Sequence, residues 1–362
     1  MDIKDFIYGL SAVIFAGLFT FTLTPPVRVL AHKLGAIDVP TDNRRMHKIP
    51  IPRMGGLAIF ISFALAIILF CEVDLPLCGL LVGAVFMVIL GMLDDIYRLN
   101  AWLKFLLQIA IATIPVFTGT TIDFVNFFGK YIVFGNASIP ITILWIVAVT
   151  NAVNLIDGLD GLACGVSTIS AFSIMAFALI KLDFKVALIV AILAGSCLGF
   201  LPYNRNPARI FMGDTGALFL GYTLSVISIM GLFKINAIVS FWVPFLILGL
   251  PLADTIFATI RRAIKRQPIF SPDRGHFHHK LIDLGFSQRQ TVTILYAVSG
   301  LLGISAITFA EDQIVPSILI IICSFIVGFF NYKIFVSDVK TRSQTGFRLK
   351  NKANNNSEEN EE

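Results

Sequence analysis

The chain has 362 residues, of which 56% are hydrophobic and only 14% are charged, and its mean hydropathy is +0.83. This balance lies well outside that of soluble globular domains, so a bilayer is the expected solvent for most of the chain. The net charge of +5 is interpreted as a result of membrane topology and of contact with anionic lipids or phosphorylated substrates, and nucleic-acid binding is not expected. The five cysteines show neither paired spacing nor a zinc-ligand pattern, so they are interpreted as packing residues.

Eleven apolar runs are separated by short polar breaks, and a helix needs about 20 apolar residues to cross a bilayer. The runs lie near 6–31, 55–71, 76–93, 101–118, 138–152, 162–181, 186–203, 214–233, 237–259, 291–310 and 313–335. The sequence therefore predicts an all-α integral membrane protein of about eleven transmembrane helices, with one domain over 1–337. The first run lacks a basic leader and a cleavage site and is expected to stay in the protein. Residues 338–362 are polar and are predicted to form a disordered cytoplasmic tail.

The basic residues are divided unevenly between the two predicted faces. One set of loops contains only Lys4, Lys130, Lys181, Lys185 and Lys234, whereas the other set and the tail hold the remaining 23 of 28 Lys and Arg. The positive-inside rule makes the second face cytoplasmic. Because the number of spans is odd, the N-terminus is expected outside and the C-terminus in the cytoplasm of a multi-pass protein of the cell membrane.

Five clusters of polar residues fall in or beside the loops of the predicted cytoplasmic face. They cover 44–56, 94–104, 151–160, 204–214 and 261–279. A transporter or lipid flippase would instead be expected to carry polar residues through the bilayer, and a scaffold without catalysis would leave five convergent loops unexplained. The pattern therefore favours a membrane enzyme with cytoplasmic catalytic loops.

Two adjacent carboxylates, Asp94 and Asp95, end the third run. Such a pair repels itself unless a cation or a bound proton relieves the charge. A solvated helix end is the alternative explanation for the pair. Lys104, which opens the next run after a short loop, favours a functional site.

Oxygen-bearing side chains follow the fifth run and precede the eighth. Asn151 and Asn154 are three residues apart and share a helix face, and Asp157 and Asp160 follow them. Amide and carboxylate oxygens suit a hard cation such as Mg²⁺, although an Asx turn and a helix cap would explain part of the run. Asp214 could be the N-cap of the eighth run, or it could ligate the same metal ion as Asn154.

The remaining candidates lie before the eighth run and after the ninth. Phe211 offers a ring on which a base could stack, although an interfacial Phe is usually a packing residue. Arg274, His276, His278 and His279 form a basic loop without a cysteine or an evident fourth zinc ligand. These four residues are better suited to a pyrophosphate, whose charge favours protonated histidines.

Taken together, these motifs resemble those of the polyprenyl-phosphate N-acetylhexosamine-1-phosphate transferases, which form the glycosyltransferase 4 superfamily. The resemblance extends over nearly all the predicted spans. It is carried by 52–56, Asp94-Asp95, 151–161, 211–216 and 276–279. The His-x-His-His form, followed by residues 280–286, is similar to the branch that uses UDP-GlcNAc. The peptidoglycan branch, which uses UDP-MurNAc-pentapeptide, usually carries a different histidine loop.

The resemblance implies an enzyme that transfers GlcNAc-1-phosphate from UDP-GlcNAc to undecaprenyl phosphate or another polyprenyl phosphate and releases UMP. The product would begin the synthesis of a cell-envelope glycan. Mg²⁺ is the implied cofactor, with Mn²⁺ as a substitute, and a homodimer is compatible with the family. Phospho-MurNAc-pentapeptide transfer is the alternative, and both a single-step reaction and a covalent Asp-phosphosugar route are compatible with the sequence.

The resemblance also implies a role for each candidate residue. The metal ion would be bound by Asn154 and Asp214, and the uridine pocket would be lined by Asn204, Phe211 and Asp157 or Asp160. The lipid phosphate would meet Asp94, Asp95 and Lys104. The diphosphate would be held by Arg274, His276, His278 and His279. Asp94, Asp95, Lys104 and His279 are the candidate catalytic residues. Arg53 and its neighbours would close the cytoplasmic cleft. Phe277 is expected to close the loop beside the histidines and so to disfavour the larger peptide donor.

Overall fold

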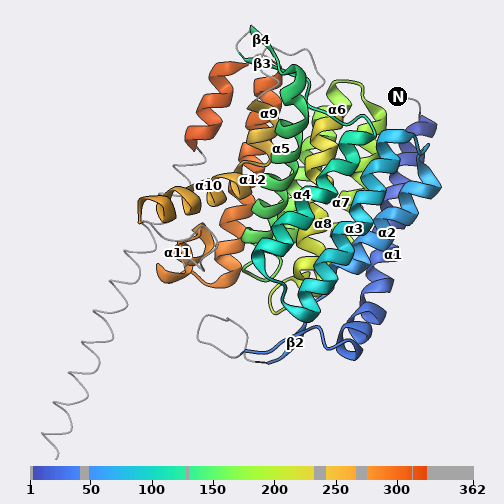
Figure 1. The fold of residues 1–362 in the computed structure, drawn as a ribbon, viewed down its shortest axis with the longest axis vertical. Helices are drawn as coiled ribbons and strands as arrows, with labels where there is room; N and C mark the ends of the chain where they lie inside the picture. Colours follow the sequence, from blue (N-terminus) through green and yellow to red (C-terminus); the bar gives the residue numbers. More distant parts are fainter. Residues whose placement is uncertain are drawn as a thin grey trace, which may run out of the picture.

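The computed structural model describes residues 3–40, 49–127, 130–231, 242–265, 275–311 and 313–323. Figure 1 shows a bundle of helices with two small hairpins at its ends. The helices are α1 (Ile3–Lys33), α2 (Gly56–Phe70), α3 (Leu75–Tyr97), α4 (Ala101–Phe117), α5 (Ser138–Ile156), α6 (Leu162–Ile180), α7 (Phe184–Asn204), α8 (Gly213–Gly231), α9 (Trp242–Ile247), α10 (Gly249–Ile264), α11 (Phe277–Asp283) and α12 (Gln288–Ala310), with the short 3₁₀ turn η1 (Gly135–Ala137) before α5 and a further helix at Ile314–Cys323.

Two antiparallel strand pairs complete the described fold. β1 (Ile37–Asp38) pairs with β2 (Ile51–Pro52), and β3 (Phe124–Phe127) pairs with β4 (Lys130–Val133). Neither hairpin was predicted from the sequence. Both lie in loops, so the predicted all-α membrane class is confirmed.

Ten of the eleven predicted runs coincide with described helices. Seven helices are long and apolar enough to cross a membrane, namely α1, α3, α5 with η1, α6, α7, α8 and α12, and three shorter apolar helices are α2, α4 and Ile314–Cys323. The fifth run is longer than predicted, because α5 continues to Ile156. The end of the eleventh run and the predicted tail lie outside the described residues.

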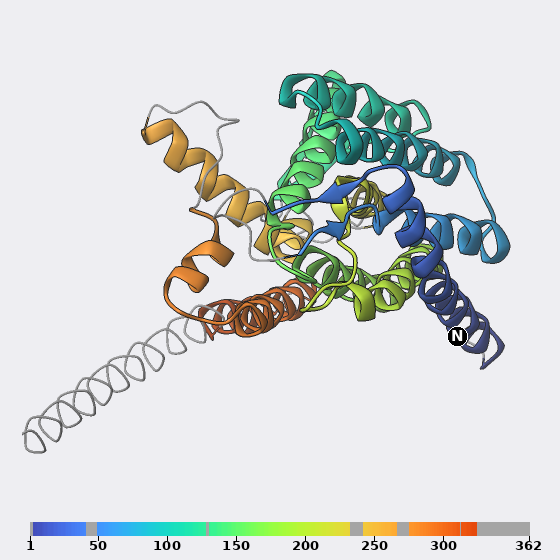
Figure 2. The same cartoon turned by 90° about the horizontal axis from the view of Figure 1, so that it is seen from below.

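The ninth predicted run, 237–259, is not one continuous helix. In its described part, α9 ends at Ile247 and α10 begins at Gly249, with a non-helical Leu248 between them. Pro251 has no backbone N–H and therefore cannot donate to the carbonyl of Ile247, which interrupts the helical ladder at this point. Figures 1 and 2 show that α10 leaves the bundle and runs across its direction.

Glycines allow several helices to approach closely. A Cβ atom on Gly199 of α7 would lie only 2.1 Å from the carbonyl oxygen of Gly17 in α1. A Cβ on Gly56, at the start of α2, would lie 2.0 Å from the Cα of Gly216 in the first turn of α8. Small residues at such crossings let membrane helices pack backbone against backbone. The second contact fixes the start of α8, the most buried of the seven long helices, against the start of α2.

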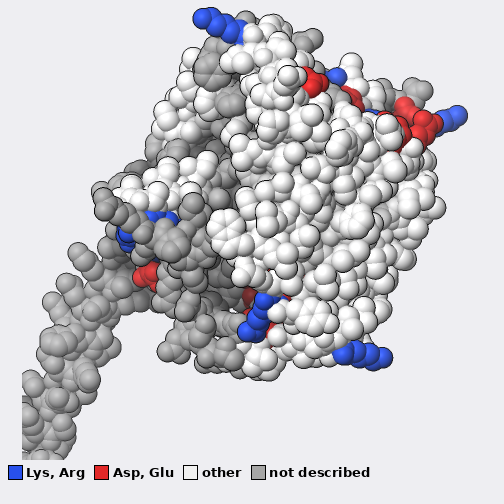
Figure 3. All heavy atoms as spheres, in the orientation of Figure 1, with Lys and Arg blue, Asp and Glu red and all other residues white. Residues whose placement is uncertain are grey.

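Charged side chains gather near the two ends of the bundle and beside α10 on the face shown in Figure 3, and the surface between them is uncharged. Large apolar side chains such as Ile14, Leu18 and Phe21, in the middle of α1, are exposed. An apolar band of this kind is what lipid contact requires. The distribution agrees with a protein that spans a membrane.

Candidate active site

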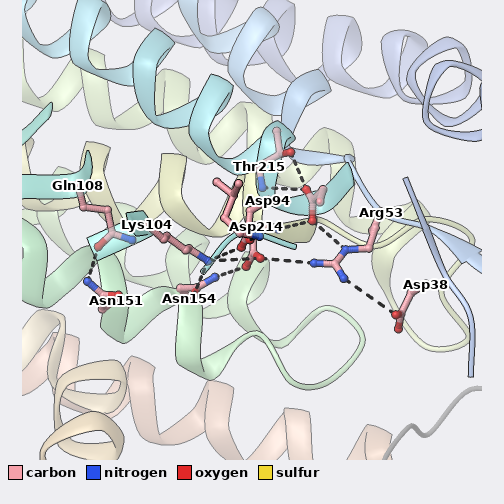
Figure 4. A network of polar contacts seen from close by, with 11 residues as sticks. Asp38, Arg53, Asp94, Lys104, Gln108, Asn151, Asn154, Asp214 and Thr215 are labelled. Atoms are coloured by element: carbon pink, nitrogen blue, oxygen red, sulfur yellow. Dashed lines mark hydrogen bonds and ion pairs between the residues drawn. The ribbon is translucent and has the colours of Figure 1, made fainter. Parts of the chain in front are cut away.

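The polar clusters meet at one end of the bundle. There α3, α5 and α7 end, and α4, α6, α8 and α12 begin. Figure 4 shows side chains from α3, α4, α5 and α8 pointing toward one another, together with Arg53 from the segment before α2. Residues from four of the five predicted clusters therefore form one network.

Asp95 holds the first turn of α8. Its Oδ1 accepts from Arg53 Nε at 2.8 Å and from the backbone N–H of Asp214 at 3.0 Å. Its Oδ2 accepts from the N–H of Thr215 at 3.0 Å and from the Thr215 hydroxyl at 2.6 Å. The Asp95 side chain is fully buried. We call Arg53, Asp95 and Thr215 the α8 clamp, in which Asp95 ties the first turn of α8 to α3 and Arg53 ties Asp95 to the segment before α2.

Arg53 is the cation of the α8 clamp. Burial opposes its charge, but Asp95 and Asp214 raise the pKa of Arg53 above its ordinary value, so it stays protonated. Two backbone hydrogen bonds fix the chain on either side of Arg53. The Phe211 N–H donates to the Pro52 carbonyl, and the Gly55 N–H donates to the Phe211 carbonyl. The segment before α2 is thus attached to the segment before α8.

Asp94 has different partners from its neighbour in sequence. Its Oδ1 accepts from the Leu99 N–H at 2.7 Å, and its Oδ2 accepts from Lys104 Nζ at 2.8 Å. Lys104 Nζ also lies 3.3 Å from Asp214 Oδ2 and 3.4 Å from Asn154 Oδ1. Lys104 therefore connects the end of α3 with α5 and α8.

The contact between α4 and α5 continues one helical turn further along. Gln108 follows Lys104 by four residues, and its Oε1 accepts from the side-chain amide of Asn151, which is three residues before Asn154. Gln108 is fully buried, and its Nε2 has no hydrogen-bond partner. The two polar pairs fix the rotation of α4 against α5 and so direct Lys104 toward Asp214.

Asp214 lies where this network meets an open pocket. Its Oδ1 accepts from the Asn154 amide, and its Oδ2 faces Lys104 and, at 3.4 Å, Arg53 Nη2. Its side chain keeps 21% of its surface exposed, in contrast to that of Asp95. Asp214 is therefore a carboxylate of this network that a ligand in the pocket can reach.

The pocket has a volume of about 320 Å³. Seven predicted site residues line it, namely Asn154, Asp157, Asp160, Asn204, Phe211, Asp214 and His279. Asn204 donates from Nδ2 to the Ile210 carbonyl at 3.1 Å, but its buried Oδ1 has no hydrogen-bond partner. A buried acceptor without a donor is costly, so a ligand that supplied a donor to this oxygen would relieve that cost.

The two carboxylates of the loop after α5 differ in their surroundings. Asp160 accepts from the side-chain amide of Asn206 at 2.9 Å and from the N–H of Ala208 at 3.0 Å, which ties this loop to the one after α7. Burial, followed by the charges of Asp214 and Asp95, raises the pKa of Asp157 to about 8. Asp157 therefore gains from a cation in the pocket, whereas Asp160 is already bound within the protein.

The three histidines do not act alike. His276 is buried and places Nδ1 2.8 Å from Asp254 Oδ2. Burial and then the neighbouring His279 lower the pKa of His278 to about 3, so it is neutral near pH 7, contrary to the expectation of protonated histidines. Only His279 of the three lines the pocket. Arg274 lies outside the described residues.

Phe277 does not line this pocket. Its ring packs edge-on against Phe257 of α10, with centroids 5.9 Å apart, and it lines a separate cavity between α10 and α11. A single residue on a short helix points to whichever face packing requires, and here that face is α10. The prediction that Phe277 excludes a larger donor is therefore wrong in its structural basis.

The donor set fits a hard divalent cation that the substrate helps to bind. Within the described residues, no three Asp, Glu, His or Cys side chains are grouped as a metal site. However, Asp157 and Asp214 both line the pocket with Asn154, so two carboxylates and an amide border the same space. Mg²⁺ is commonly held by one or two carboxylates together with substrate phosphates.

Two functional candidates were missed in the sequence. Asp254, on α10, is buried and bonds to His276. Its signal was a carboxylate inside an apolar run, where an ionisable residue points to a specific partner. Asp38 lines the pocket with its side chain 4.0 Å from Arg53, and only the tertiary fold identifies it.

Comparison with known proteins agrees with this geometry. The model of glycosyl transferase family 4 matches residues 77–232. A probable undecaprenyl-phosphate N-acetylglucosaminyl 1-phosphate transferase of Bacillus subtilis is 43% identical, covering 86% of this chain and 87% of the relative. A decaprenyl-phosphate N-acetylglucosaminephosphotransferase of Mycobacterium tuberculosis is 36% identical over 80% of both chains. A phospho-N-acetylmuramoyl-pentapeptide-transferase of Staphylococcus aureus is 35% identical over 83% of this chain and 98% of the relative. The chain belongs to glycosyl transferase family 4, the family of polyprenyl-phosphate N-acetylhexosamine-1-phosphate transferases that its motifs resemble.

Proposed function

We propose that the protein transfers GlcNAc-1-phosphate from UDP-GlcNAc to undecaprenyl phosphate or a related polyprenyl phosphate. The observation that carries this proposal is the position of Asp214, which borders the pocket on one side and Lys104 on the other. A nucleotide in the pocket and a lipid phosphate at Lys104 would meet at this carboxylate. The names of the relatives from Bacillus subtilis and Mycobacterium tuberculosis supply the sugar and the class of acceptor.

The pocket suits the nucleotide part of the donor. Its volume of about 320 Å³ is within the usual range of small-molecule sites, of the order of 300–1,000 Å³. The Asn204 Oδ1 can accept from the uracil N–H, and Phe211 offers an apolar surface to the base. His279 would contact the diphosphate. Asp160 contributes by fixing the loop.

The reaction joins an oxygen of the polyprenyl phosphate to the phosphorus that carries the sugar. The bond from that phosphorus to the bridging oxygen breaks, and the electron pair leaves with UMP. Lys104 would neutralise the attacking phosphate and hold it near the donor. Asp214 and Asn154 would hold Mg²⁺ or Mn²⁺, whose contribution is to neutralise charge on the phosphate oxygens.

Asp94 and Asp95 receive separate roles in this proposal. Asp94 orients Lys104, to which it is bonded at 2.8 Å. Asp95 fixes α8 and is far from free to accept a proton from a substrate, since its two oxygens accept four hydrogen bonds. A phosphate is already largely ionised near neutral pH, so a base is not needed for attack. Trapping a phosphosugar on the enzyme without acceptor lipid would contradict this single-step route.

The site is proposed to face the cytoplasm of the cell membrane, with the N-terminus outside. The uneven distribution of Lys and Arg, of which the sequence predicts 23 of 28 on the side of the site, supports this orientation. In sealed membranes, UDP-GlcNAc added to inside-out vesicles should then be used, and UDP-GlcNAc added to right-side-out vesicles should not.

The decisive experiment measures UMP release by the purified protein with undecaprenyl phosphate and either UDP-GlcNAc or UDP-MurNAc-pentapeptide. We expect turnover with UDP-GlcNAc and little with the peptide donor. The converse result would assign the chain to the peptidoglycan reaction and leave the chemistry unchanged. The absence of UMP release with both donors would reject the proposed function.

A further inference from the structure

Asp254 is a buried carboxylate that none of the roles above uses. It lies on α10, in a stretch that is otherwise apolar apart from its two threonines, and only 3% of its surface is exposed. An ionised carboxylate in such a place is costly unless donors compensate it. Its Oδ2 lies 2.8 Å from His276 Nδ1, and its Oδ1 accepts from the Phe277 N–H at 2.7 Å. Both bonds come from the residues at which α11 starts.

The far side of α11 rests on the wall of the pocket. A Cβ atom on Gly158 would lie 2.3 Å from Nε2 of His278, so the ring packs directly against the backbone of the loop that carries Asp157. The next residue, His279, lines the pocket. A shift of α11 would therefore move His279 relative to the nucleotide site.

The support for α11 comes from an element that the broken ninth span creates. Because the helix is interrupted at Leu248, α10 runs across the bundle, as Figure 1 shows, and packs against α5 and α12. Asp254 faces the start of α11 from this position. The carboxylate is a polar link between α10 and the histidine segment.

We infer that Asp254 is a positioning residue, which holds His276 and the first turn of α11 so that His279 faces the diphosphate of the donor. An ionised carboxylate can only accept, so the bond requires the proton of His276 to be on Nδ1. This inference rests on the proposed function insofar as the donor is a UDP-sugar. It names a residue that acts through His279 and does not touch the substrate.

The test is a double-mutant cycle on the full-length purified protein, with Asp254→Ala, His279→Ala and the double variant. UDP is the probe for calorimetric binding, and UDP-GlcNAc is the substrate for kinetics. Asp254→Ala should weaken UDP binding and raise KM roughly tenfold, the size expected for loss of a hydrogen bond to a charged group, with a smaller change in kcat. The double variant should bind UDP no more weakly than His279→Ala alone, because both changes remove the same interaction.

Asp183→Ala is the matched control. Asp183 also accepts from the N–H of a first helical turn, at 3.0 Å from Val186, but it lies at the opposite end of the bundle. This variant should bind UDP like the wild type. If Asp254→Ala does not yield folded protein, Asp254→Asn, which keeps an acceptor for the Phe277 N–H, replaces it in the cycle with a smaller expected loss.

The inference would be overturned if the losses of UDP affinity in the two single variants multiplied in the double variant. Unchanged UDP binding in Asp254→Ala would also overturn it. A wild-type protein that binds no UDP would overturn it as well. A wild-type protein that binds UDP but releases no UMP from UDP-GlcNAc would reject only the proposed function, because UDP is shared by all donors of this class.

Discussion

The α8 clamp and the pocket wall lie side by side, but they differ in how fully their polar groups are hydrogen-bonded. In the clamp, Asp95 accepts four hydrogen bonds and is fully buried. At the pocket wall, Asn204 keeps a buried oxygen without a donor, and Asp157 has a raised pKa. Satisfied groups stabilise the fold, whereas groups that lack partners gain from a ligand. The comparison separates residues that build the site from residues that bind in it.

The same division runs through the adjacent pair at the end of α3. Asp94 faces Lys104, and Asp95 faces the start of α8. Two residues that look equivalent in the sequence therefore have different expected effects when they are replaced. Activity and stability must be measured separately to see the difference.

The largest effect is expected for Asp214, which borders the pocket. Asp214→Ala should lower turnover about a thousandfold, since a group that holds a cation against the reacting phosphates supplies electrostatic stabilisation of that size. The melting temperature should change little, because the side chain is partly exposed to the pocket. UMP release at increasing Mg²⁺ concentrations measures the first quantity. Near-normal Mg²⁺-dependent turnover would refute the metal role.

A large loss of stability is expected for Asp95. Asp95→Ala leaves Arg53 Nε and the N–H groups of Asp214 and Thr215 without their acceptor, which should cost about 3 kcal/mol of unfolding free energy. Thermal unfolding in detergent without ligand measures this loss, and Asp95→Asn, which keeps an acceptor, should lose less. An Asp95→Ala protein with wild-type stability and no activity would instead make Asp95 a catalytic residue.

A smaller effect on the unfolding free energy is expected from the titration of Asp157, because water in the pocket can stabilise its charge. Its pKa is raised from 3.8 to about 8 in the folded protein, so between these values the folded state holds a proton that the unfolded chain has lost. The contribution of protonated Asp157 to the unfolding free energy is fully present below pH 4, falls as the pH rises and is lost above pH 8. The stability of the wild type relative to Asp157→Asn should therefore fall from pH 4 to pH 8. Parallel unfolding curves for the two proteins would contradict the shifted pKa.

The sequence was sufficient for the spans and for the gathering of the polar clusters. Ten apolar runs became helices because in a bilayer the backbone must satisfy its own hydrogen bonds. Counting spans then put the ends of α3, α5 and α7 on one side before any contact was known. That shared side allowed Asn154 and Asp214 to be proposed for one site, and the structure adds the direct hydrogen bond between them.

The remaining features depend on tertiary packing. The sequence predicted 237–259 as one continuous run, and neither the break at Leu248 nor the direction of α10 was anticipated. The direction of Phe277 was predicted wrongly because a short helix can turn either face to a neighbour, and only Phe257 determines which face is buried. Asp254 was passed over because its partner, His276, comes from a separate loop.

The α8 clamp also has a consequence for biosynthesis. Asp95 and Thr215 are 120 residues apart in the chain, and translation proceeds at about 5–20 residues per second, so Asp95 leaves the ribosome roughly 6–24 s before its partner. During that interval its carboxylate lacks the amides and the hydroxyl of α8 and must remain hydrated at the membrane surface. α3 therefore enters the bilayer before α8 does, with its Asp95 end still in water. The arrival of α8 then allows the carboxylate to become buried.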